Sequence, residues 1–178
     1  MNDNISVGEF EVETGKVIVS DPCYERPEEM GHRLNGELKN VKNGSWIANI
    51  IEIDGRVGYL ICHHQKNPVF TPRASGWKKI RDFEVAVDSG QGGVFDSKYY
   101  KDDEVVKACN RKYKGDPINP EDKWYSICCD RTLSKDMAGV IPFGVVSSTG
   151  YGDGCYDASI KKDKNKIVGI MIDFGLGD

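Results

Sequence analysis

The chain has 178 residues and a net charge of −4, because 28 acidic residues outnumber 24 basic ones. Hydrophobic residues make up 39% of the sequence and charged residues 29%, which supplies enough apolar material for a packed core and argues against disorder. This balance also argues against a nucleic-acid-binding protein and a polybasic membrane-surface protein, since both need an excess of Lys and Arg.

The N-terminal segment predicts a β-hairpin. Phe10 and Val12 alternate with acidic residues, as expected for a strand with one apolar face. Residues 14–16, with the sequence Thr-Gly-Lys, form the expected turn, and the apolar run 17–19 forms the returning strand. Pro22 ends that strand because proline cannot donate to the hydrogen-bond ladder.

Residues 47–64 give the strongest local signal, a second hairpin. Asp54 and Gly55 are the pair that a type I′ turn prefers, since both central residues of that turn need a positive φ angle. Apolar residues, many of them β-branched, flank the turn on both sides. The segments 22–43 and 66–79 lack such patterning and are expected to be long loops, which are commonly functional or mobile.

Residues 102–114 predict the one sizeable helix. Asp102 or Asp103 suits the N-cap, and Glu104 favours the positive helix start. Apolar residues recur at three-to-four-residue spacing before Gly115: Val105, Val106, Cys109 and Tyr113.

The remaining segments predict strands at 83–87, 124–129 and 139–146, with Pro142 placing the last at an edge or a bulge. Residues 155–172 predict a closing hairpin. Strands separated by turns rather than helices indicate a mostly β fold, α+β at the margin. We expect a single domain over residues 1–178 with an antiparallel sheet system, either a partly open barrel or a sandwich.

Cysteine usage and the chain ends predict a cytoplasmic protein. No apolar run approaches the ~20 residues of a membrane span. Residues 1–13 lack the basic and apolar segments of a signal peptide, so the six cysteines are expected to be reduced. We expect neither membrane nor nucleic-acid partners.

Five aspartates lie where an expected strand meets a turn: Asp21, Asp88, Asp96, Asp153 and Asp173. Clustered carboxylates could hold Mg²⁺, Ca²⁺ or Mn²⁺, or divide acid and base roles. The alternative is that each carboxylate bonds to nearby backbone in a turn, a role that Asp commonly fills. Because successive antiparallel strand ends alternate between opposite edges, the five acids form either one cluster or two.

The glycine-rich segments fail the tests for nucleotide and calcium loops. In residues 150–154 the spacing is not that of a dinucleotide motif, because Cys155 replaces the third glycine. Residues 89–93 fail too, with Phe95 at the corresponding position. Counted from Asp153, the EF-hand positions for glycine and the final glutamate are also wrong. A backbone nest for an anion or a tight turn remains.

Two further groups have weaker chemical interpretations. Cys62, His63 and His64 could contribute to a zinc site with Cys23, His32 or Cys155, or His63 could pair with Cys23 or Cys155 as a nucleophile. The favoured interpretation is a strand end with two partly exposed imidazoles and core thiols. The basic residues Arg73, Lys78, Lys79 and Arg81 surround Trp77 and could grip an acidic partner or a single strand, or form a solvated loop.

Four segments occur in a familiar order: TGKVIVSDP, FEVAVDSGQGGVFD, YGDGCYD and IDFG. In this order the chain resembles the bacterial and phage family called domain of unknown function 4241 (DUF4241), over residues 15–174. The resemblance implies a single mostly β domain and no particular reaction. It nominates as site residues Asp21, Asp88, Asp96, Gly152, Asp153, Gly154, Tyr156 and Asp173.

Two functions follow as hypotheses. The first is a small binding or accessory module whose Asp- and Gly-rich loops engage a small ligand or a protein partner. The second is a hydrolase assisted by a divalent metal, with ligands Asp21, Asp88, Asp153 and Asp173. The first is favoured because the chain shows no tight catalytic motif.

Overall fold

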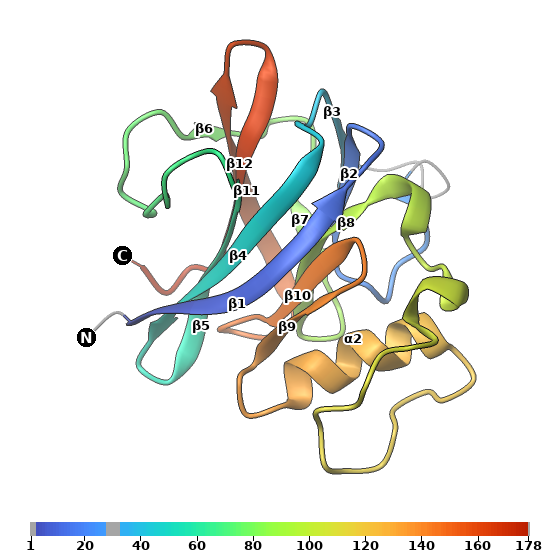
Figure 1. Cartoon of the computed structure of the whole chain (residues 1–178). Coiled ribbons are helices and arrows are strands. Elements are labelled where there is room, and N and C mark those ends of the chain that lie inside the picture. The colour runs from blue at the N-terminus through green and yellow to red at the C-terminus, as the bar shows by residue number, and fades with distance from the viewer. Residues whose placement is uncertain (1–2, 28–32, 178) are drawn as a thin grey trace.

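Two antiparallel sheets pack face to face in the computed structural model, which describes residues 3–27 and 33–177 (Figure 1). The first sheet has the strand order β1 (Asp3–Val12), β4 (Gly44–Ile53), β5 (Arg56–His64), β12 (Lys166–Asp173), β11 (Gly154–Asp163), β6 (Lys78–Lys79), with β7 (Val85–Val87) also paired to β11. The second has the order β3 (Gly36–Lys39), β2 (Lys16–Ser20), β8 (Gln91–Asp96), β10 (Gly144–Ser148), β9 (Ala138–Ile141). The expected mostly β, antiparallel fold is confirmed, and the sheets do not close into a barrel.

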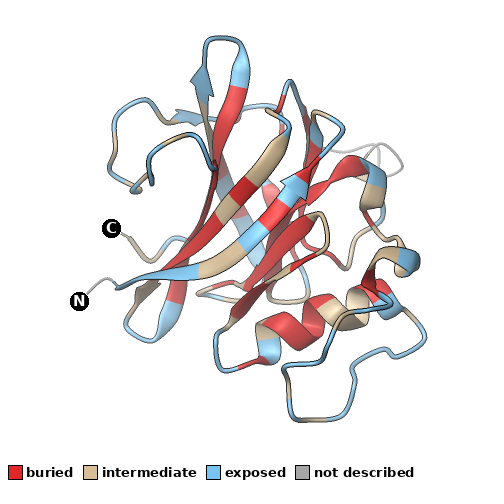
Figure 2. Cartoon of the chain, in the orientation of Figure 1, coloured by how far each residue is buried: buried red, intermediate tan, exposed pale blue. Residues whose placement is uncertain are grey.

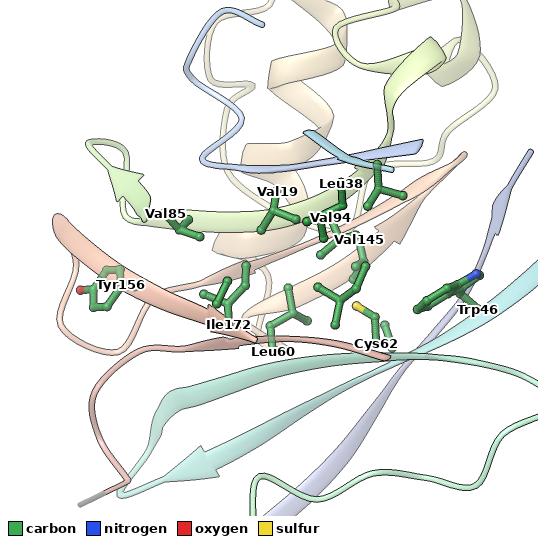
Figure 3. Close-up of a cluster of buried hydrophobic side chains, with 14 of the residues drawn as sticks. Val19, Leu38, Trp46, Leu60, Cys62, Val85, Val94, Val145, Tyr156 and Ile172 are labelled. Atoms are coloured by element: carbon green, nitrogen blue, oxygen red, sulfur yellow. The ribbon is translucent and has the colours of Figure 1, made fainter. Parts of the chain in front are cut away.

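The main core lies between the sheets (Figure 3). Because side chains alternate along a strand, Leu60 and Cys62 of β5 point into this core while Ile61 points to the outer face. From the second sheet Val19 and Val94 meet them, and all of these side chains are buried. Each fully buried aliphatic side chain of this kind stabilises the fold by about 1.5–3 kcal/mol.

The outer face of the second sheet is covered by α2 (Lys123–Leu133), the single α-helix among the described residues (Figures 1 and 2). Trp124 and Cys128 of this helix pack on Ile18 and Phe95 of the sheet. The strand expected at 124–129 is therefore wrong. Its aromatic and β-branched residues resemble a strand, but Asp122 caps a helix by accepting a hydrogen bond from the Tyr125 amide at 2.9 Å.

The helix expected at 102–114 is also wrong in position. Asp102 does cap a helical start, accepting from the Glu104 amide at 2.9 Å, but only the 3₁₀ turn η2 (Asp103–Val106) forms. Beyond it the amides of Lys112 and Tyr113 bond to the Asp130 carboxylate at 2.9–3.0 Å. A distant side chain thus takes the donors that an α-helix would have used.

The first expected hairpin has correct strands and the wrong pairing. β1 pairs with β4 in the first sheet, whereas β2 pairs with β3 and β8 in the second. The turn between β1 and β2 is therefore a corner between sheets. Asp96 holds this corner, because its carboxylate accepts from the Glu13 and Thr14 amides at 2.7 and 3.1 Å.

The other two hairpins are confirmed. β4 and β5 meet at Asp54 and Gly55, whose φ angles of 51° and 76° are those of a type I′ turn. β11 and β12 pair from residue 157 to residue 173. Pro142 lies in the turn between β9 and β10, and the segment 22–43 contains β3, which the sequence did not predict.

The loop 66–77 covers part of the outer face of the first sheet. The Lys161 ammonium lies 4.3 Å from the Phe70 ring centre and 5.2 Å from that of Trp77, and it donates to the Ser75 carbonyl at 2.6 Å. Trp77 also donates to the Thr71 carbonyl at 2.9 Å. The tryptophan of the basic segment thus fastens its own loop. No helix in the described segments is long and apolar enough to cross a membrane.

Candidate functional site

Asp21 lies at the centre of a loop cluster at one end of the second sheet. It follows β2 directly and is fully buried. Its carboxylate accepts hydrogen bonds from the Cys23 amide at 2.8 Å, the Asp88 amide at 2.9 Å, and both the amide and hydroxyl of Ser89 at 2.7 and 2.6 Å. These four bonds tie the loop after β2 to the turn between β7 and β8.

Asp88 and Asp153 lie at the exposed side of the same cluster. The Tyr24 hydroxyl donates to Asp88 at 2.5 Å. The Asp153 carboxylate accepts from the Gly90 amide at 3.1 Å. Three of the five predicted aspartates, Asp21, Asp88 and Asp153, therefore meet at the turn 88–90. The sequence alone left open which of the five come together.

The predicted residues Gly152, Gly154 and Tyr156 shape the loop that carries Asp153. Gly152 has a φ angle of +83°, a conformation that side chains disfavour. Its carbonyl accepts hydrogen bonds from the hydroxyls of Tyr156 and Thr149, both at 2.7 Å. Gly154 begins β11 with a φ angle of +157°. These residues position Asp153 rather than supplying chemistry of their own.

Asp96 and Asp173 do not join this cluster. Asp96 ends β8, the strand that begins beside the cluster, and bonds to the corner between the sheets. Asp173 ends β12 and accepts from the Gly175 amide at 2.8 Å. The hydrogen bonds thus join Asp21, Asp88 and Asp153 in one cluster, whereas Asp96 bonds at the far end of β8 and Asp173 bonds within its own turn.

A side-chain network continues from Ser89 to the helix. Gln91 donates through its amide to the Ser89 hydroxyl at 3.1 Å and contacts the Cys129 sulfur at 3.5 Å. The Thr132 hydroxyl donates to the side-chain oxygen of Gln91 at 3.1 Å. Sequence reasoning missed Cys129 and Thr132 because it placed no helix there; once the helix is known, their i, i+3 spacing puts them on neighbouring positions of one face.

The thiol and phenol groups of the cluster are held in their neutral forms. Burial raises the pKa of the Cys23 thiol to about 12, and the charge of Asp21 adds to this shift. Burial and the hydrogen bond to Asp88 likewise raise the pKa of Tyr24 above its ordinary value. At neutral pH the cluster therefore offers a protonated thiol and a hydroxyl, not a thiolate nucleophile.

The described residues do not assemble a metal centre. Within residues 3–27 and 33–177 no group of three or more His, Cys, Asp or Glu side chains is placed to hold a metal ion. The Asp21 carboxylate accepts four hydrogen bonds from protein donors. The zinc hypothesis fares no better: Cys62 is buried in the core and the His64 ring bonds to the Asn43 carbonyl at 3.0 Å. His32 lies outside the described residues.

Comparisons with protein-family models, with curated proteins and with solved structures give no match for this chain. The resemblance to DUF4241 therefore stays a prediction.

The geometry of the site combines a fixed interior with an exposed border. We call Tyr24, Asp88, Tyr151 and Asp153 the loop rim. Asp88 and Asp153 are exposed, and Tyr151 has 63% of its surface accessible. The hydrogen bonds beneath hold the three loops that carry these residues in fixed positions, so the rim can meet a partner without first ordering its backbone.

Proposed function

We propose that the protein is a binding module whose loop rim engages a partner carrying basic groups. The observation that supports this proposal is the difference between the inner and outer carboxylates of the loop cluster. The inner carboxylate of Asp21 is saturated by protein donors, whereas the outer carboxylates of Asp88 and Asp153 are exposed.

A binding role suits these groups better than catalysis. Cys23 keeps its proton at neutral pH, so it lacks the reactivity of a thiolate. The Ser89 hydroxyl donates to Asp21, and this carboxylate also accepts three amide protons, so all of its printed bonds hold loop backbone or Ser89 in place. The network therefore stabilises loops instead of activating a nucleophile.

The rim also indicates the chemistry of the partner. Two exposed carboxylates attract Lys or Arg side chains through complementary charge. Tyr151 adds a large amphipathic surface of the kind that anchors protein interfaces. A protein or peptide segment with one or two basic residues beside an apolar residue fits this arrangement.

Selection from a library of random short peptides tests the proposal. Peptides that bind the wild-type protein should be rich in Lys and Arg. They should lose most of their affinity for the double variant Asp88→Asn/Asp153→Asn and for Tyr151→Ala, and retain it for Asp163→Asn, a matched change on the exposed β11–β12 turn. Peptides that bind the double variant as well as the wild type would contradict the proposal.

The metal-assisted hydrolase remains the alternative, with Asp21, Asp88, Asp153 and Asp173 as its proposed ligands. Two features count against it. Asp21 would have to give up hydrogen bonds to three amides before it could ligate a cation. Asp173 bonds within its own turn, at the end of β12. We therefore favour the binding module.

A further inference from the structure

A second candidate site lies between α2 and the segment 107–122, which runs alongside that helix (Figure 1). Here a cleft of about 600 Å³ opens at the C-terminal end of α2. Its lining consists of Lys112, Tyr113, Lys114, Leu133, Ser134, Lys135 and Asp136. This volume falls in the range of small-molecule sites.

A buried ion pair fixes one wall of the cleft. Asp130 and Arg131 are both buried, and their charged groups lie 2.5 Å apart. Asp130 binds the amides of Lys112 and Tyr113, and Arg131 donates to the Asn110 carbonyl at 3.0 Å. The backbone that carries the two lysines is therefore held in place before any ligand arrives.

Three ammonium groups line the cleft against one carboxylate. Lys112 and Lys114 come from the segment 107–122, and Lys135 comes from the end of the helix. None of the three forms an ion pair with the part of the chain that the structure describes. A lysine at a helix C-terminus can serve the helix dipole, which accounts for Lys135. That role does not account for Lys112 and Lys114, which belong to another segment.

The same cleft offers an apolar surface. Leu133, at the end of α2, is 47% exposed and lines the cleft. Tyr113 is folded over Gly115 so closely that a Cβ atom there would lie 2.4 Å from the ring. Glycine at 115 thus lets the tyrosine ring lie against its own loop, where it lines the cleft.

We propose that this cleft binds a nucleoside monophosphate or a phosphate monoester of similar size. Lysine ammonium groups suit phosphate as point charges. The exposed Leu133 and the Tyr113 ring suit a flat base, and Asp136 can accept a hydrogen bond from a sugar hydroxyl. Inorganic phosphate alone would leave most of the volume unfilled.

Calorimetric titration of the full chain tests this inference. The probes are the adenosine, guanosine, cytidine and uridine 5′-monophosphates, with inorganic phosphate and adenosine as the two halves of the ligand. At least one monophosphate should bind more tightly than either half, and its affinity should fall as salt is added. The double variant Lys112→Ala/Lys114→Ala should weaken it by roughly tenfold or more, at several-fold per exposed ammonium group.

Two further variants distinguish binding in the cleft from non-specific attraction of phosphate to surface lysines. Lys162→Ala/Lys164→Ala removes the same charge from the exposed end of the β11–β12 hairpin and should leave affinity unchanged. Gly115→Ala should displace the Tyr113 ring and weaken the monophosphate more than inorganic phosphate. The inference is overturned if no monophosphate binds more tightly than inorganic phosphate, if both lysine double variants weaken binding equally, or if a phosphotyrosine peptide binds more tightly than every nucleotide.

Discussion

Replacing Asp21 by asparagine should destabilise the protein far more than one buried hydrogen bond is worth. An asparagine keeps one acceptor oxygen and turns the other into an NH₂ donor. If the NH₂ group faced the amides of Asp88 and Ser89, two backbone donors would lose their acceptor. If it faced the other way, the Ser89 hydroxyl could rotate to accept, and only the Cys23 amide would be stranded.

The second orientation strands fewer donors, so it determines how much stability the variant loses. One stranded backbone donor costs about 1–3 kcal/mol, and the remaining bonds lose the extra strength that an ionised acceptor gives. We therefore expect Asp21→Asn to lower the free energy of unfolding by about 2–4 kcal/mol. Asp21→Ala strands all of the donors and should cost about 4–6 kcal/mol, and Ser89→Ala, which removes one donor, about 1–2 kcal/mol.

Urea unfolding followed by tryptophan fluorescence measures these differences, because Trp46 and Trp124 are both buried. The matched control is Asp163→Asn, an exposed aspartate that should change stability by less than about 0.5 kcal/mol. Since a domain of this kind is typically stable by about 5–15 kcal/mol, Asp21→Asn and Ser89→Ala stay measurable even if Asp21→Ala fails to fold. An Asp21→Asn protein as stable as its control would refute the reasoning.

Four other predictions concern the thiol, the metal hypothesis and the buried ion pair. Cys23 should react slowly with iodoacetamide at neutral pH. The labelling rate of the wild type should rise only toward pH 12. At neutral pH the rate should be higher in Asp21→Asn, because this variant lacks a charge that raises the thiol pKa. Mass spectrometry of the labelled peptide measures both rates, and rapid labelling of the folded wild type at neutral pH would contradict the prediction. Because that pKa is raised, the thiol's contribution to stability is complete below the ordinary value of 9.0 and is lost between about pH 9 and 12, which alkaline unfolding curves can follow. Mg²⁺, Mn²⁺ and Ca²⁺ chlorides should leave the melting temperature where NaCl of equal ionic strength leaves it; a rise that depends on Asp88 and Asp153 would revive the metal hypothesis. Asp130→Asn should lower the free energy of unfolding by about 3–5 kcal/mol, since it breaks a buried ion pair. It should also make residues 107–122 sensitive to limited proteolysis. A stable, protease-resistant variant would show that other contacts hold this segment.

Local sequence patterns predicted the parts of this fold that depend on neighbouring residues. The Asp54-Gly55 turn and the closing hairpin need only their own residues to form. Where the sequence misled, a distant side chain decided the outcome. Asp130 bonds to amides 17 and 18 residues away, and Asp96 holds a corner 82 and 83 residues away. No pattern over a short window contains that information.

The candidate site shows the same limit. Strand–turn positions and motif order nominated Asp21, Asp88 and Asp153 along with two other aspartates. They did not show which aspartates meet, because that depends on strand order in two sheets. In the sequence, Ser89 is notable only as the first residue of the glycine-rich segment 89–93, which does not match a nucleotide-binding motif. In the structure its amide and hydroxyl provide two of the four bonds to Asp21. Cys129 could not be recognised while its segment was taken for a strand.

An NMR titration tests the central claim most directly. The labelled wild-type protein is titrated with a basic peptide selected from the library, and amide chemical shifts are followed along the chain. The account predicts that the changes concentrate at residues 23–25, 88–91 and 150–154, the three loops that Asp21 and its neighbours hold together. Changes confined to another surface, such as the loop 66–77 over the first sheet, would show that the loop rim is not the binding site.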